Sequence, residues 1–89
     1  MMLRIDPVQG RIRLSGELRS EHLDQVKAEI ERPASPVVLD LEEVDLVDIE
    51  AVRFLNLCES RGISILHCSL YIREWMLQER GRPTVQPEP

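Results

Sequence analysis

Acidic side chains gather in the middle of this 89-residue chain, where no basic residue separates them. They are Asp40, Glu42, Glu43, Asp45, Asp48 and Glu50. Clustered carboxylates can bind a hard cation such as Ca²⁺, but this spacing differs from that of an EF-hand loop. The stretch therefore indicates a solvated acidic loop rather than a calcium site.

The two histidines and two cysteines are the other residues that could react or bind metal. His22 is expected in solvent, on a helix face or near its cap, and His67 on a core strand in a structural role. Cys58 and Cys68 are expected as small buried side chains without a disulfide. Zinc requires four ligands, and adjacent His67 and Cys68 would point to opposite faces of a strand. We therefore expect no metal site.

Sequence motifs for the common catalytic sites are absent. There is no G-x-S-x-G, P-loop or G-x-G-x-x-G motif, because the four glycines lie far apart. We expect neither enzymatic activity nor a cofactor. A net charge of −5 and 3% aromatic residues argue against nucleic acid as a partner. The longest apolar run has three residues and no secretory signal is visible, so a cytoplasmic protein without membrane insertion is expected.

In the first third of the chain the hydrophobic period changes from that of strands to that of a helix. Alternation of apolar and polar residues within 3–15 predicts a β-hairpin with a turn at 7–10. Gly16 is expected to close the second strand, either as a bulge or where another backbone approaches closely. Helical spacing then predicts a helix over 20–31 with Ser20 as its N-cap.

The middle of the chain predicts a strand followed by a helix. Residues 37–41 are almost all apolar, which is typical of a strand buried on both faces. Asp48 is the expected N-cap of a second helix, and Gly62 stands where its C′ residue should be. The acidic stretch then lies beyond the carboxyl end of the strand, where α/β proteins place functional surfaces.

A last strand over 63–68 and a third helix over 69–81, capped by Ser69, complete the predicted elements. The order is β-β-α-β-α-β-α. We expect a single α/β domain over 1–82 and a disordered, proline-rich tail over 83–89.

Two segments carry a family resemblance. Residues 37–41 read Val-Val-Leu-Asp-Leu, followed by Val44 and by Val47-Asp48 at a helix start, and residues 14–18 read Leu-Ser-Gly-Glu-Leu. They resemble the STAS domain, a family of anti-sigma factor antagonists and related bacterial regulatory modules. The resemblance covers about residues 3–80. It implies a small domain with a mixed sheet and helices packed mainly on one face.

The chain departs from the family's pattern at the start of the second helix. In members regulated by phosphorylation, two hydroxyl residues and a glycine follow the aspartate, and the second hydroxyl accepts the phosphate. Here these positions hold Ile49, Glu50 and Ala51. The resemblance thus places Glu50, which cannot be phosphorylated, at the acceptor position. It carries one negative charge, against about −2 for a phosphate.

The resemblance implies a non-enzymatic module for protein–protein interaction in signal transduction. Its partner-binding residues would be Asp45, Val47, Asp48, Ile49, Glu50 and Arg53. The implied partner is an anti-sigma factor or a serine-kinase-like ATPase. The alternative is a soluble accessory subunit of a bacterial lipid-transport ABC complex, bound to its ABC ATPase. For Ile49 two interpretations stay open, an exposed contact residue or a side chain that folds into the core.

Overall fold

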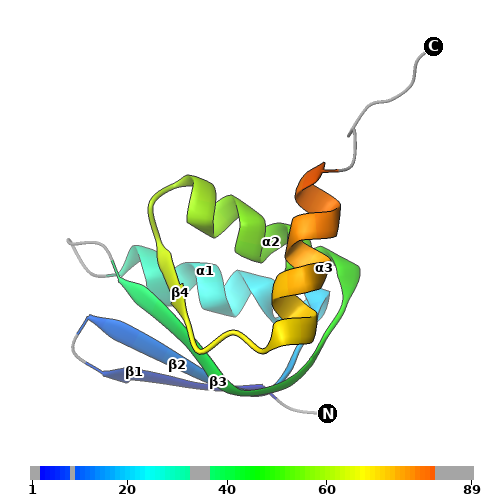
Figure 1. Cartoon of the computed structure of the whole chain (residues 1–89). Coiled ribbons are helices and arrows are strands. Elements are labelled where there is room, and N and C mark those ends of the chain that lie inside the picture. Colours follow the sequence, from blue (N-terminus) through cyan, green and yellow to red (C-terminus); the bar gives the residue numbers. More distant parts are fainter. Residues whose placement is uncertain (1–2, 9, 33–36, 82–89) are drawn as a thin grey trace.

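The computed structural model describes residues 3–8, 10–32 and 37–81, which form a four-stranded sheet and three α-helices (Figure 1). In chain order the elements are β1 (Leu3–Val8), β2 (Arg11–Leu18), the 3₁₀ helix η1 (Ser20–His22), α1 (Leu23–Glu31), β3 (Val38–Val47), α2 (Ile49–Ser60), β4 (Ser64–Leu66) and α3 (Leu70–Gly81). The expected order of strands and α-helices is confirmed. The expected connection at 33–36 and the tail at 83–89 lie outside the described residues.

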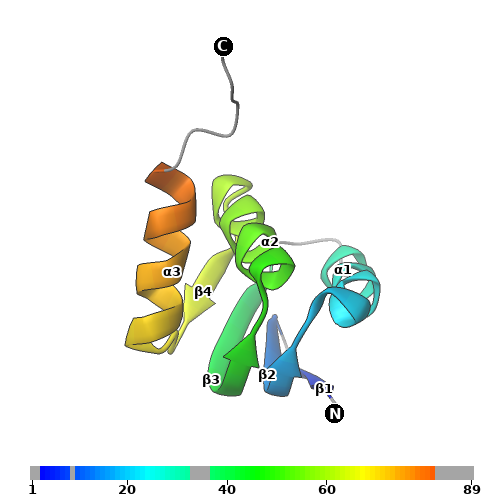
Figure 2. The same cartoon turned by 90° about the vertical axis from the view of Figure 1, so that its right-hand side faces the viewer.

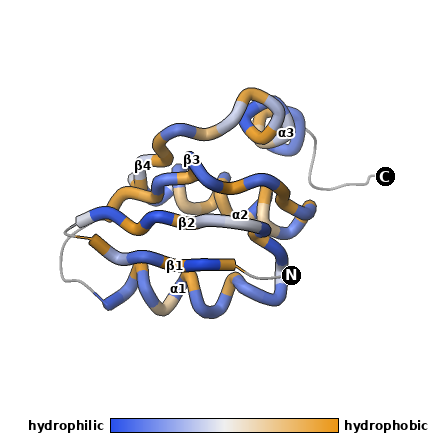
Figure 3. The backbone as a smooth tube through the Cα atoms, turned by 90° about the horizontal axis from the view of Figure 1, so that it is seen from below, coloured by the Kyte–Doolittle hydropathy of each residue, from blue (hydrophilic) through white to orange (hydrophobic). Residues whose placement is uncertain are grey.

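The sheet is mixed, as the family resemblance implied. Its strand order is β1-β2-β3-β4, with β1 antiparallel to β2, and with β3 parallel to both β2 and β4. Helices α1 and α2 lie over one face, while α3 stands beside α2 and β4 (Figure 2). The opposite face carries no helix within the described residues (Figure 3). None of the described helices is long and apolar enough to cross a membrane.

The core lies between the sheet and helices α1 and α2. Leu14 of β2, Leu39 of β3, Val26 of α1 and Leu55 of α2 have no solvent-exposed surface. Ile72 and Met76 of α3 join the same core from the side of α2. The periodicities that predicted the two central strands and the inner faces of the helices therefore identify core residues.

Strand β3 differs most from the sequence prediction. It runs for ten residues to Val47, so the expected acidic loop is the second half of a strand. Its pairing with β2 shifts register twice, and each shift leaves an extra residue in β3. The buried side chains of β3 are Leu39, Asp40, Leu41, Val44 and Val47. Bulges of this kind break the two-residue alternation by which a strand is recognised in a sequence.

Strand β2 also exceeds its prediction, because Gly16 does not end it. Gly16 has a φ of +99° beside the second register shift, and the strand continues to Leu18. Glycine adopts this backbone conformation without the steric cost that a side chain would bring. Gly62 follows α2 with a φ of +89°, which confirms its expected C′ position.

The start of α1 was predicted incorrectly, whereas α3 begins directly after Ser69 but without the expected side-chain cap. Ser20 begins η1 rather than capping α1, and His22, expected in solvent, is buried and accepts a hydrogen bond from the Arg19 N–H on Nδ1. The 3₁₀ turn is an element that the sequence analysis did not predict. The Ser69 hydroxyl caps nothing, since its oxygen is buried and unpaired within the described residues. The Ser69 carbonyl instead accepts the Arg73 N–H.

Candidate functional site

Asp48 organises the corner at which β3 passes into α2. Its Oδ1 accepts a hydrogen bond from the Ala51 N–H at 2.9 Å, which confirms the expected N-cap. Its Oδ2 accepts a second hydrogen bond, also 2.9 Å long, from the Ser20 N–H. One carboxylate thus caps α2 and also binds the first residue of η1, Ser20, which lies 28 residues earlier in the chain.

The environment of Asp48 favours its charged form. Burial by itself raises the pKa of the carboxyl, but the hydrogen bonds from Ser20 and Ala51 and the nearby charge of Arg19 outweigh it. The pKa of Asp48 therefore lies below its ordinary value. A negative charge here also suits the positive end of the α2 dipole.

The other partner-binding residues expected at this corner divide between surface and core. Asp45, Glu50 and Arg53 are exposed, whereas Val47 is only 5% exposed and belongs to the core. Ile49 is 36% exposed and counts among the exposed large apolar residues of the described chain. Ile49 does not belong to the core cluster, so the interpretation that it folds into the core is wrong.

Charged contacts order this surface. Arg53 Nη1 lies 3.6 Å from Glu50 Oε2, and Arg53 Nε lies 3.4 Å from Glu79 Oε1 on α3. Arg53 thus lies between the first turn of α2 and α3, in contacts on the surface. The Glu50 side chain is exposed in the first turn of α2, where its carboxylate provides a negative charge.

Sequence reasoning missed two apolar residues at the same corner. Leu46 is 46% exposed near the end of β3, and Tyr71 of α3 is 48% exposed. The Tyr71 hydroxyl donates to the Asp45 carbonyl at 3.0 Å, which brings the aromatic side chain next to the end of β3. No pattern in the sequence pairs residues 45 and 71, because only the packing of α3 brings them together.

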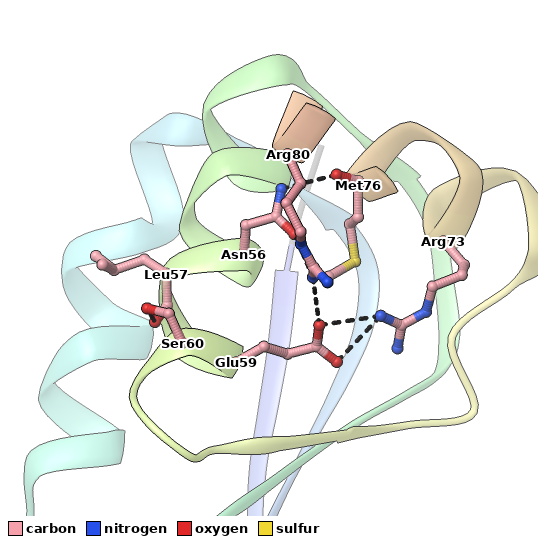
Figure 4. A network of polar contacts seen from close by, with 7 residues as sticks. All are labelled: Asn56, Leu57, Glu59, Ser60, Arg73, Met76 and Arg80. Carbon is pink, nitrogen blue, oxygen red and sulfur yellow. Dashed lines mark hydrogen bonds and ion pairs between the residues drawn. The ribbon is translucent and has the colours of Figure 1, made fainter. Parts of the chain in front are cut away.

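A polar network holds α3 against α2 (Figure 4). Both Glu59 oxygens accept hydrogen bonds from Arg73 at 3.0 Å, and Oε1 accepts a further one from Arg80 at 2.7 Å. Asn56 donates to the Met76 carbonyl and accepts from Arg80, both at 2.9 Å. This network fixes the position of α3 and therefore that of Tyr71.

The same network controls the ionisation of Glu59. Burial raises the pKa of its carboxyl, but Arg80 and Arg73 together hold that pKa below the ordinary value. Glu59 is therefore the anionic centre of the contact between the two helices.

The described cysteines offer no reactive thiolate at neutral pH. Both are free, with Cys58 buried and Cys68 partly buried. Burial raises the pKa of Cys58 to about 11 and also raises the pKa of Cys68. A thiol of raised pKa is a poor nucleophile. The corner at which β3 passes into α2 instead presents exposed charged and apolar side chains.

Comparisons with known proteins agree with this architecture. The sequence model of the family described as "Mlab, STAS domain" matches residues 1–67. The chain therefore belongs to the STAS domain family. The match ends at His67, so α3 and its Tyr71 lie beyond it.

One similar solved structure is an uncharacterized protein from Shewanella loihica PV-4 that is described as having a SpoIIAA-like fold. It shares 17% sequence identity, covers 89% of this chain and 75% of its own, and gives a TM-score of 0.40. No curated protein matches the chain.

Proposed function

We propose that this STAS domain is a non-enzymatic protein-interaction module that docks through its β3–α2 corner. The proposed docking surface, called the corner surface below, consists of Asp45, Leu46, Ile49, Glu50, Arg53 and Tyr71. The observation that carries the proposal is the presence of three partly exposed large apolar side chains, Leu46, Ile49 and Tyr71, beside charged residues on one ordered corner.

This composition suits protein recognition. A few residues, most often Trp, Tyr and Arg, supply most of the binding energy in protein interfaces, and the surrounding polar rim is solvent-accessible. The corner surface also rests on regular elements, because Asp48 caps α2 and the Glu59 network holds α3. A surface that is ordered before binding loses less conformational entropy on docking.

Val47 and Asp48 support this surface without forming it. Val47 packs in the core, and the Asp48 oxygens are engaged by Ser20 and Ala51. Substitution of either residue should affect binding through the position of Ile49 and Glu50 rather than through a lost contact with the partner.

The first turn of α2 is not a phosphorylation switch in this proposal. Residues 45–55 include no serine, threonine or tyrosine, and Glu50 provides a permanent single charge. A partner would therefore bind constitutively. An anti-sigma factor or serine-kinase-like ATPase is the first candidate partner, by family resemblance.

The lack of an acceptor hydroxyl favours a second candidate, an ABC ATPase. A soluble accessory subunit of a bacterial lipid-transport complex would need permanent association rather than a phosphorylation cycle. Affinity capture with the tagged full chain, followed by mass spectrometry, distinguishes the two partner classes.

The corner surface is tested with a pair of variants on one helix. Ile49→Arg should weaken binding of the captured partner by at least about tenfold, or about 1.4 kcal/mol. Leu57→Arg is the control, because Leu57 is also a large exposed apolar residue of α2 but lies toward its other end. Equal effects of the two substitutions would place the docking surface elsewhere.

A further inference from the structure

A second group of ionisable side chains lies away from the corner surface, where β3 meets the end of β4. Asp40 and Glu42 belong to β3, and Asp40 pairs with Leu66, the last residue of β4. His67 follows directly. One oxygen of each carboxylate and one imidazole nitrogen lie within 4.8 Å of one another.

The backbone at His67 brings its ring to this position. His67 has a φ of +55°, in the left-handed region that non-glycine residues seldom adopt. Its Nδ1 lies 3.0 Å from Asp40 Oδ1. The sequence argument against a metal site assumed that His67 continues a strand, whereas the strand ends at Leu66 and the ring turns toward Asp40.

Asp40 is the unusual member of the group. Its side chain is 0% exposed. Oδ1 accepts the Glu42 N–H at 3.0 Å and faces His67, but Oδ2 has no hydrogen-bond partner within the described residues. The nearest cation, Arg11 Nη1, lies 3.6 Å from Oδ2, beyond ordinary hydrogen-bond distance. Buried carboxylate oxygens are rarely left without a hydrogen bond, so this carboxylate retains capacity to bind a further ligand.

We propose that Asp40, Glu42 and His67 bind one divalent transition-metal ion of the zinc type. Two carboxylate oxygens and one imidazole nitrogen form a ligand set that Zn²⁺ and Co²⁺ accept. Three protein ligands leave one position of a tetrahedral site free. Glu42 and His67 are exposed, so that position is open to water or to an incoming ligand.

Two arginines compete with the metal for the same oxygens. Arg13 Nη2 lies 3.7 Å from Glu42 Oε1, and Arg11 approaches Asp40 as described. Both arginine side chains are about half exposed and can turn into solvent when the metal binds. Removing one of them should therefore strengthen metal binding, which a merely structural cluster of charges does not predict.

The test measures Zn²⁺ binding to the full chain by calorimetry. The wild type should bind one equivalent, Glu42→Gln and His67→Gln should each weaken binding by more than about tenfold, and Arg13→Gln should tighten it. Glu43→Gln is the matched control, since Glu43 is an exposed neighbour outside the cluster. Melting curves without metal check that each variant folds.

Absorption of the Co²⁺ complex distinguishes this site from the thiol of Cys68. Nitrogen and oxygen ligands should give only weak visible bands, without the intense near-ultraviolet charge transfer of a cobalt–thiolate bond. A wild type that binds no Zn²⁺, a Glu42→Gln variant that binds as tightly as the wild type, or thiolate bands would each overturn the proposal. These results leave the corner surface unaffected.

Discussion

Replacing Asp48 with alanine should destabilise the domain by more than the loss of an ordinary helix cap does. The substitution leaves two backbone N–H groups without their acceptor, that of Ala51 inside α2 and that of Ser20 in η1. Loss of an N-cap typically costs about 1 kcal/mol. In the second hydrogen bond, the Ser20 N–H donates to a charged Asp48 oxygen. Because this bond is exposed, we assign it about 1 kcal/mol as well. The expected loss is about 2 kcal/mol.

Urea denaturation of the wild type and Asp48→Ala measures this difference, with Asp48→Asn as the control. For a domain of this size, 2 kcal/mol corresponds to a fall in Tm of about 8–16 °C. Asparagine keeps one acceptor oxygen and should recover about half of the loss. A loss below about 0.5 kcal/mol would refute the double role of the carboxylate.

The same pair of proteins should show a defined pH dependence. Because the folded-state pKa of Asp48 is lowered, its contribution is fully present above the unfolded-state pKa of about 3.9 and is lost as the pH falls through the folded-state value. The stability difference between wild type and Asp48→Ala should therefore be constant near neutrality and shrink under acid conditions. A difference that grows on acidification would contradict the assigned charge state.

Three further substitutions test other parts of the structure. Leu39→Ala removes a fully buried side chain from the central strand and should cost about 2–5 kcal/mol in denaturation experiments; a Tm within a few degrees of wild type would contradict that core position. Glu59→Gln should lower the free energy of unfolding by only about 1 kcal/mol, because the arginines that Glu59 binds are partly exposed. It should also speed hydrogen exchange in α3, and unchanged exchange would show that apolar packing alone holds this helix. Glu50→Ser restores a hydroxyl at the acceptor position, so mass spectrometry after incubation with a captured kinase should find phosphate there and none within 45–55 of the wild type; lack of transfer to the variant would count against the alignment with phosphorylated relatives.

Local sequence patterns were sufficient for the element order. Hydrophobic spacing depends on residues two to four positions apart, so it identified the hairpin, the central strand and the inner faces of the helices. The Asp48 cap and Gly62 are equally local, because a cap bond spans three residues and a C′ glycine depends on its own φ. Charged residues at the β3–α2 corner could also be named from the sequence.

Only tertiary structure decided the remaining features, since each depends on pairing between distant segments. Pairing with β2, through two register shifts, makes the apparent acidic loop part of a strand, and packing buries Asp40. The second hydrogen bond of Asp48 joins residues 28 positions apart, and Tyr71 reaches Asp45 across 26 positions. His67 meets Asp40 because β4 ends at Leu66 beside β3. Contacts between distant segments leave no periodic trace in a single sequence, because their energy depends on how the whole sheet and its helices pack.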